Sequence, residues 1–536
     1  MKKIATLLLA AGLVFGAATG ASAIDFKAKG QWIMSFDYGE NGNFMGKNGG
    51  HTKTGFGNGE DDFEARQRVR LQLDAVASEA LSATFGVEIG KNIWGKAGST
   101  KQGGAALGAD QTGIIKVRWA YLDWMVPQTD LKVRMGIQPM VLPSFTIGGS
   151  NVLWDDVAGI TASYQVNDMV NITAAWARPY NDNYSGTNWS GDSDRAGYLD
   201  NLDAFALLVP LTFDGVKVTP WGMYAAIGPN TFRKSNDKDT RASDDYFGSA
   251  WTAESKGQTL SGLFPVGGAR HKNFKSANNV ANRHLTSYGN AWWGGLTGEL
   301  TMFDPFRLAW DFNYGSVNWE DDGRLNRQGW MASLLAEYKL DWAIPGIYGW
   351  YASGDDSNPS NGSERMPVIS AGNSTNGFSS FAFDGEPNIA RDNVIGHTMV
   401  GTWGVGARLK DMSFIEDLKH TFRVNFMGGT NSKSMAKKMS LAGLWANGTD
   451  LTDESHPSWS VGHESMYLTT GDTALELGLT NSYKMYENFT INLEADYMAL
   501  WLDTGKSAWG ARHRDGKSIP QTKDAWNINA SFVYSF

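Results

Sequence analysis

The chain has 536 residues, no cysteine and a formal net charge of −9. The lack of cysteine excludes disulfides and thiolate metal sites, and the acidic balance argues against nucleic acid as a partner. After residue 23 no apolar run approaches the roughly 18 residues that a spanning helix needs, so this chain would have to enter a membrane as strands.

The first 23 residues predict a secretory signal peptide. Lys2 and Lys3 precede an apolar run, and Ala21-Ser22-Ala23 forms a small-residue cleavage site. This prediction excludes the cytoplasm. No Pro-rich, Ser-rich or like-charge linker divides residues 24–536, so we expect them to form a single domain.

Apolar and polar residues begin to alternate directly after the signal, in residues 26–38. The same period of two fills 63–77 and, after a short turn at Ser78, 81–89. This period predicts strands with one apolar and one polar face.

The unit of two strands and a short turn recurs along the chain, and long polar loops separate the pairs. Asp214-Gly215 is one of the strongest turn signals. We expect about 18 strands, with 16 as the alternative, each near the 9 to 11 residues that a tilted membrane strand requires. The further predicted strands are 114–125, 131–140, 158–166, 170–178, 203–211, 216–226, 292–302, 306–314, 330–340, 347–353, 399–409, 420–428, 475–483, 489–501 and 524–536.

The last of these strands, 524–536, has an apolar side that is half aromatic and ends on Phe536. Such a strand resembles the closing strand of a bacterial outer-membrane β-barrel. The pattern therefore predicts an all-β fold, a transmembrane antiparallel barrel with short periplasmic turns and long extracellular loops. The barrel must be closed, because an open edge in lipid leaves backbone groups unpaired. Aromatic residues near strand ends fit membrane interfaces, although ordinary β-propensity would also explain them.

The polar side of the strands would line the lumen, and it is basic near the N-terminus. Two-residue spacing along a strand separates such side chains by about 6.6 to 7 Å. In confined water this cluster would favour anions, or alternatively the cations pair with lumen carboxylates and rigidify the wall. The facing of Lys116 and Arg118 is ambiguous, because the residues on both sides of the strand are apolar in the stretch that follows them, 119–125. The cations are Arg66, Arg68, Arg70, Lys116, Arg118, Lys132 and Arg134, with Glu64, Asp74 and Glu88 near them.

The segment 138–156 is a candidate constriction. Its Pro143, Phe145 and paired glycines suit a compact loop folded into the barrel, and Asp155 and Asp156 would oppose the basic ladder across it. Alternatively the segment is a capped strand end without functional weight. The largest loop, 227–290, carries nine Lys or Arg residues and two His residues and is a second candidate for selectivity.

No enzyme motif and no cofactor site is apparent, and the eight His residues are scattered. Gly354-Asp355-Asp356 could bind Ca²⁺, but such clusters are usually solvated, so a metal stays unknown. The inward positions are mostly Ser, Thr, Asn, Arg and Glu, which favours a water-filled lumen over a packed one.

The segments DFKAKGQWIMSFDYGE, EARQRVRLQLDAVASEALSATFGVEIG, VRWAYLDWMVPQTDLKVRMGIQP and WNINASFVYSF resemble the outer membrane homotrimeric porins of sulfate-reducing bacteria. The resemblance covers essentially the whole mature chain. It implies a homotrimer of water-filled barrels in the outer membrane, in contact with lipid and lipopolysaccharide, passing small hydrophilic solutes. Two stretches, EARQRVRLQLDA and KVRMGIQP, also resemble strands of general and phosphate-selective porins whose basic residues line the narrowest region. By strand position this role carries over to Arg66, Arg68, Arg70, Lys132 and Arg134. The long third loop of general porins has no obvious equal here.

We therefore expect a passive diffusion channel that leans towards anions and performs no catalysis. The alternatives are a substrate-selective phosphate or sulfate porin and a non-conducting structural or adhesive barrel. Trimer contact would involve the first and last strands, where Ala65, Ala75 and Ala77 permit close approach.

Overall fold

The computed structural model describes residues 24–42, 44, 63–97, 104–106, 115–181, 201–229, 231, 259, 262–265, 287–320, 323–358, 360–369, 378–379, 395, 398–436, 467–503 and 523–536. The expected signal peptide, residues 1–23, lies outside these ranges. So do most of the loop 227–290 and its cations.

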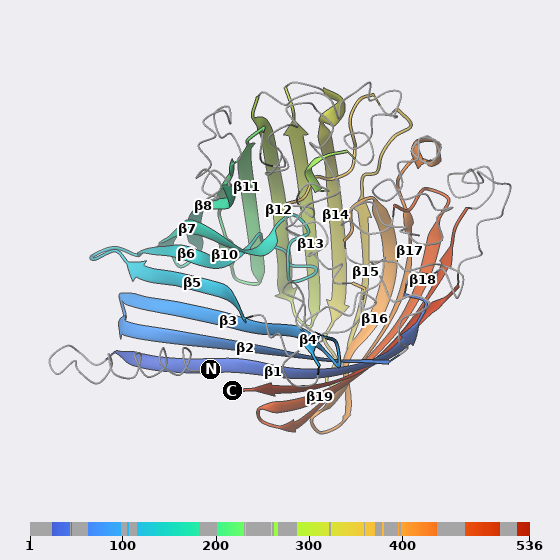
Figure 1. The fold of residues 1–536 in the computed structure, drawn as a ribbon, viewed down its shortest axis with the longest axis horizontal. Coiled ribbons are helices and arrows are strands. Elements are labelled where there is room, and N and C mark those ends of the chain that lie inside the picture. Colours follow the sequence, from blue (N-terminus) through green and yellow to red (C-terminus); the bar gives the residue numbers. More distant parts are fainter. Residues whose placement is uncertain are drawn as a thin grey trace.

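The described residues form one sheet in which each strand pairs with its neighbours in the chain (Figure 1). All pairings are antiparallel except that of β4 with β3. The strands are β1 (Asp25–Glu40), β2 (Phe63–Ser78), β3 (Leu81–Trp94), β4 (Gly104–Ala105), β5 (Ile115–Met125), β6 (Leu131–Val141), β7 (Trp154–Asn167), β8 (Val170–Asn181), β9 (Asn201–Leu208), β10 (Leu211–Phe213), β11 (Val216–Ile227), β12 (Gly289–Phe303), β13 (Phe306–Asn318), β14 (Arg327–Tyr338), β15 (Ile344–Ala352), β16 (Thr402–Ile415), β17 (Leu418–Gly429), β18 (Thr473–Tyr486), β19 (Phe489–Trp501) and β20 (Ala525–Ser535). A short 3-10 helix, η8 (Gly323–Leu325), precedes β14.

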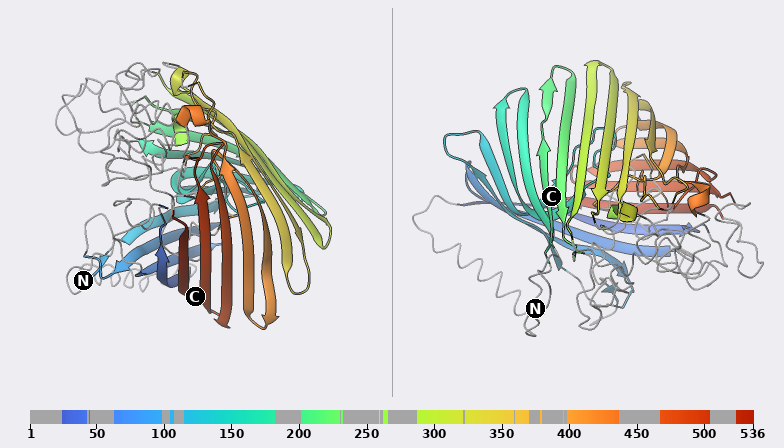
Figure 2. Two further views of the ribbon diagram at one scale, coloured as in Figure 1. Left: turned by 90° about the vertical axis from the view of Figure 1, so that its right-hand side faces the viewer. Right: turned by 90° about the horizontal axis from the view of Figure 1, so that it is seen from above.

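The sheet closes on itself, because β1 pairs with both β2 and β20. β9 and β10 act as one wall strand interrupted at 209–210, since both pair with β8 and with β11. The two-residue β4 only extends the end of β3. The result is a closed antiparallel barrel of 18 strands, which confirms the predicted fold and excludes the 16-strand alternative. Figure 2 shows the wall from two further directions, bending round a single interior.

Closure depends on a close approach between Gly30 and Phe536. The amide of Gly30 donates to the carbonyl oxygen of Phe536 at 2.8 Å, and the amide of Phe536 donates back to Gly30 at 3.0 Å. A Cβ on Gly30 would lie 2.5 Å from the Phe536 ring. Glycine at position 30 therefore makes room for the terminal aromatic ring.

The outer face of the barrel is apolar. Exposed large side chains recur at every second position along most strands, among them Trp292 at 59%, Ile347 at 66% and Trp501 at 51%. Phe36 on this face contacts the rings of Phe63, Trp94 and Phe532 beside the closure. Among the described residues, no helix has the length and apolar character needed to cross a membrane.

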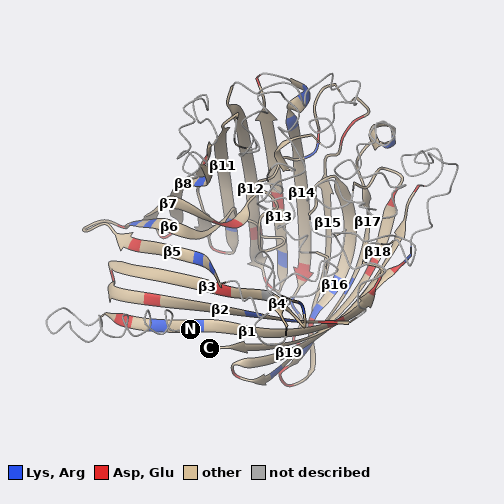
Figure 3. Ribbon diagram, in the orientation of Figure 1, with Lys and Arg blue, Asp and Glu red and all other residues tan. Residues whose placement is uncertain are grey.

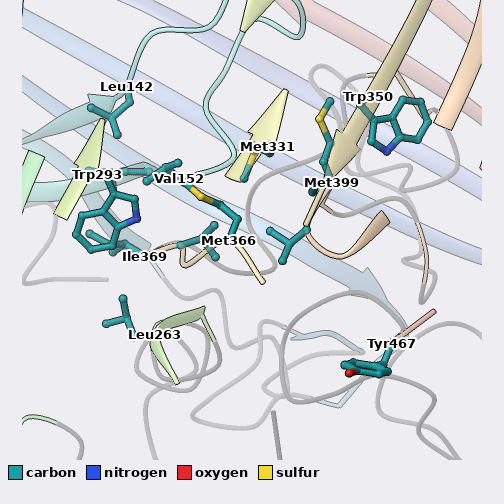
Figure 4. Close-up of a cluster of buried hydrophobic side chains, with 14 of the residues drawn as sticks. Leu142, Val152, Leu263, Trp293, Met331, Trp350, Met366, Ile369, Met399 and Tyr467 are labelled. Carbon is teal, nitrogen blue, oxygen red and sulfur yellow. The ribbon is translucent and has the colours of Figure 1, made fainter. Parts of the chain in front are cut away.

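The inner face is polar in some regions and apolar in others. One large cluster of buried apolar side chains, here called the loop core, joins the inner wall to residues of the connecting segments (Figure 4). Trp293, Met331 and Trp350 contribute from strands, and Val152, Met366 and Met399 from connections. The expectation that inward positions are mostly polar is therefore wrong for the inner face of β11 to β15 near the loop ends. Residues on both faces of these strands are apolar there, because loop residues instead of water cover the inner face.

Candidate functional site

The connection between β6 and β7, residues 142–153 and here called L3, folds into the barrel. Its residues meet Asp311, an inward-facing carboxylate of β13 that is 5% exposed. Asp311 accepts hydrogen bonds from the Ser144 hydroxyl at 2.6 Å, the Phe145 amide at 2.9 Å and the Thr146 amide at 3.1 Å. The wall strands β7, β8, β9, β11 and β12 lie between β6 and β13, so this contact crosses the interior.

Further contacts hold L3 against the wall formed by β13 and β14. The Arg307 guanidinium donates to the carbonyl oxygen of Phe145 at 2.9 Å, and the hydroxyls of Thr146 and Ser333 are 2.7 Å apart. At the far end of L3, the amide of Ile369 donates to Val152 at 2.9 Å. The capped-strand-end alternative is thus wrong for these residues, because L3 turns inward and is held there.

Below L3 an alternating row of charges follows β11 to β16. Lys217 pairs with Glu299 at 3.1 Å, and Arg307 pairs with Glu299 at 2.9 Å. Glu337 then accepts from Arg307 at 2.9 Å and from Arg408 at 2.6 Å. Figure 3 shows basic and acidic positions on β13, β14 and β16. Each carboxylate in this row is shared between two cations.

The predicted basic ladder lies on β2. Arg66 pairs with Glu64, Arg68 is 3% exposed and donates to Gln31 at 3.4 Å, and Arg70 donates to Glu88 at 2.8 Å. The Arg66 and Arg70 side chains are thus neutralised locally. This arrangement agrees with the alternative that such cations rigidify the wall.

A bulge in the pairing of β3 with β5 resolves the ambiguous facing on β5. Register shifts between Gly86 and Val87, so that Gly86 is opposite Trp119 and Glu88 is opposite Lys116. Trp119 therefore shares the face of Gly86 and packs over it. Lys116 shares the face of Glu88, and its side chain is exposed.

Arg118 joins β5 to β7 through Asp156. The Arg118 Nε lies 2.8 Å from an Asp156 carboxylate oxygen, and the Trp119 indole donates to the other oxygen at 2.7 Å. Asp155 is exposed and accepts a hydrogen bond from the amide of Asp156. Asp156 is therefore beside the basic residues of the adjoining wall, and not across the interior from them as expected.

Lys132 and Arg134 share one carboxylate. Arg134 binds Asp123 through two hydrogen bonds of 2.7 and 2.9 Å, and Lys132 lies 3.1 Å from the same group. The Arg134 guanidinium also stacks over the Tyr121 ring at 4.1 Å. Asp123 was not predicted as their partner, because it lies in the stretch of β5 whose facing the sequence left ambiguous.

A cavity of about 400 Å³ opens beside the basic residues of β2 and β5. Its cationic lining consists of Lys29, Arg70 and Arg118, and its other polar side chains include Gln31, Gln72 and Ser535. Guanidinium and ammonium groups around a cavity of this kind can hold an anionic or hydrogen-bonding solute.

Six charged residues of the opposite wall were not predicted as site residues: Asp311 and the row of Lys217, Glu299, Arg307, Glu337 and Arg408. All six residues lie on the inward side of the predicted strands, so parity alone would have nominated them. No local feature, however, marks Asp311 as the residue that meets L3, because that contact joins positions 165 residues apart.

The acidic stretch considered for Ca²⁺ is occupied by internal hydrogen bonds. The Tyr467 hydroxyl donates to Asp355 at 2.7 Å, and the amide of Asp356 donates to Glu364 at 2.9 Å. Burial raises the pKa of Glu364, and the charges of Asp355 and Asp356 raise it further. Within the described ranges no three His, Asp or Glu side chains are grouped to hold a metal ion.

No protein-family model matches the sequence, and no curated protein matches it. Among solved structures, the chain is similar to OccK11 (OpdR) of Pseudomonas aeruginosa, with 9% identity, coverage of 96% of each chain and a TM-score of 0.44. It is also similar to OprD of Pseudomonas aeruginosa, with 10% identity, coverage of 96% and 97%, and a TM-score of 0.45. For outer-membrane expressed OmpT of Vibrio cholerae the identity is 9%, the coverage 96% and 99%, and the TM-score 0.36. The resemblance to porins of sulfate-reducing bacteria stays a prediction.

Proposed function

We propose that this protein is an outer-membrane porin, a channel for passive diffusion of small hydrophilic solutes and ions. The observation that carries the proposal is the inward course of L3, tied by Asp311 to the far wall inside a closed barrel. An inward loop narrows the passage, and the charged walls beside it give the remaining space a polar lining. Channels that select by charge rings use this arrangement.

We assign the passage a preference for anions. The pore lining we propose comprises Arg66, Arg68, Arg70, Lys116, Arg118, Lys132, Arg134, Asp155 and Asp156. Because Glu64, Glu88, Asp123 and Asp156 pair with several of these cations, the preference is modest. A phosphate- or sulfate-selective channel is a stronger form of the same proposal.

The membrane location is supported by the apolar outer face and by the predicted signal peptide, which would direct export through the inner membrane. Lipid and lipopolysaccharide would contact the exposed aromatic side chains. We also propose a homotrimer in which the aromatic group of Phe36, Phe63, Trp94 and Phe532 lies at the contact. A heat-resistant oligomer on gels is the expected result, and a monomer at every temperature would contradict it.

A second function is favoured by the loop core. Bulky inward side chains such as Trp293 and Trp350 are buried under loop residues, which is what a non-conducting structural or adhesive barrel requires. In that case the loops would bind a partner at the surface.

The deciding experiment is the reversal potential of the purified protein in a planar bilayer under a KCl gradient. We expect an anion-selective current that becomes less selective when Arg66, Arg68 and Arg70 are changed together to Ala. A cation-selective current would contradict the role of the ladder and keep the channel. No current under any condition would reject the channel in favour of the structural barrel.

A further inference from the structure

A groove on the outer face of the barrel crosses the wall from β13 to β17, and its volume is about 450 Å³. Ala336 and Ala407 lie on either side of Ile347 in the register, so short side chains form its floor. The rings of Phe306 and Phe422 line its two ends. Ile347 is 66% exposed, and the residues opposite it share its outward side. The groove therefore opens towards the surroundings of the barrel and not into the lumen.

The groove lies near the short turns, where membrane strands reach the level of the lipid headgroups. Tyr338, the last residue of β14, lines the groove. Trp342 in the turn that follows is exposed and stacks on the exposed ring of Phe414 at 5.8 Å. Trp and Tyr side chains are enriched at membrane interfaces, because one end of each is apolar and the other is polar. One end of the groove is therefore at the headgroups, and the rest reaches into the hydrocarbon layer.

A polar pair interrupts the apolar outer face beside the groove. His420 is opposite Asn481 in the register and lies two residues from Phe422 on the same outward side, about 6.6 to 7 Å along the strand. The Asn481 amide group donates to the carbonyl oxygen of Leu493 at 3.1 Å, so its Oδ1 accepts from the His420 Nδ1 at 2.6 Å.

The Nε2 atom of His420 is left to bind a further group. Among the described residues, His420 makes its hydrogen bond through Nδ1 alone. Nε2 accepts a hydrogen bond when the ring is neutral and donates one when the ring is charged. A phospholipid headgroup offers a partner in both states, an ammonium or hydroxyl donor in the first and a phosphate acceptor in the second.

The position and length of the groove fit a lipid chain. Strands β18 and β19 separate it from β20, so it stays in contact with lipid in the trimer proposed above. It crosses four strand spacings, roughly 19 Å in all. The acyl layer of one leaflet is about 15 Å thick, half of the hydrocarbon core. An unfilled groove would forfeit the dispersion contacts of its lining. Inside a membrane the hydrophobic effect does not favour the groove over other chains, so close packing and the polar contact at His420 must supply the preference.

We propose that this groove binds a phospholipid of the periplasmic leaflet, with one acyl chain over Ala336 and Ala407 and the headgroup at His420. The leaflet follows from the short turns, which face the periplasm in barrels of this kind. The site rests on the proposed membrane location and does not require that the barrel conducts.

The test uses the full-length protein, purified in detergent, stripped of lipid and titrated with dioleoyl phosphatidylethanolamine. Native mass spectrometry measures the fraction of barrels that retain one lipid. Ala407→Phe should fill the floor of the groove and raise the lipid concentration for half occupancy about tenfold or more. His420→Leu removes the Nε2 contact and should raise it about fivefold. Ala174→Phe adds the same ring at an exposed, outward position of β8, opposite the exposed Leu207, and should keep wild-type retention.

The heat-modifiable folded band shows that each variant is folded. Unchanged lipid retention in Ala407→Phe would overturn the proposal, as would an equal loss in Ala174→Phe. If Ala407→Phe instead lowers the oligomer mass and leaves lipid retention unchanged, the groove is a contact between copies of the chain. Cell fractionation separates the two levels of the argument. A protein absent from the outer membrane would contradict the location itself, whereas one present there with unchanged retention in the variants would contradict only the lipid site.

Discussion

The attachment of L3 to Asp311 can be tested by removing the carboxylate. Asp311→Ala deprives the Ser144 hydroxyl and the amides of Phe145 and Thr146 of their acceptor at a site that is 5% exposed. Hydrogen bonds to a charged group contribute roughly 1.5 to 3 kcal/mol each, and they are not additive. We therefore expect the bound position of L3 to lose about 3 to 6 kcal/mol.

A loss of about 3 kcal/mol raises the released population of L3 by roughly a hundredfold. Two measurements follow this change: hydrogen exchange of the amides in residues 142–153, and single-channel conductance in planar bilayers. Exchange should accelerate in L3, and the conductance should increase because the loop no longer narrows the interior. The strands themselves should keep their protection, since the wall pairing of β13 does not use the Asp311 side chain.

Asp341→Ala is the matched control, because it removes a carboxylate from the exposed turn between β14 and β15. It should leave both readouts unchanged. If Asp311→Ala is folded and shows wild-type exchange in L3 together with wild-type conductance, the assigned tether is refuted. If exchange accelerates without any current, the tether is correct and the channel proposal fails.

Three further predictions follow from described contacts. Arg327 is fully buried and donates to the carbonyl oxygens of Phe264, Arg365 and Met366, so Arg327→Met should release the segments around these residues, detected as new protease cleavage there with the barrel intact. Gly30→Val should prevent the Phe536 ring from seating against β1, detected as loss of the heat-modifiable folded band, whereas Gly323→Val in an open position should fold normally. The pKa of Glu364 is raised in the folded protein, so the stability that its protonated form contributes is present below its unfolded pKa and lost as pH rises through its folded pKa. Hydrogen exchange in 355–365 should therefore accelerate over that pH interval. An identical pH profile in Glu364→Gln would contradict this.

The sequence by itself determined the barrel. Alternation with a period of two, interrupted by turn residues such as Asp214-Gly215, specifies which residues lie on each face and where the chain reverses. These are local properties, so all the predicted strands occur in the structure, and closure follows from the need to pair every strand edge. The inward side of β2 was predictable for the same reason.

Only the tertiary structure decided what fills the interior. The course of L3 to Asp311, the burial of Trp293 and Trp350 and the partners of the basic ladder all join segments that are distant in the sequence. The bulge on β5 changes parity by one residue, which moves Trp119 to the inner face without any sign in the composition. The alternation of side chains shows on which face of the sheet each residue lies. It does not show what covers that face, because this depends on how the loops fold across the closed barrel.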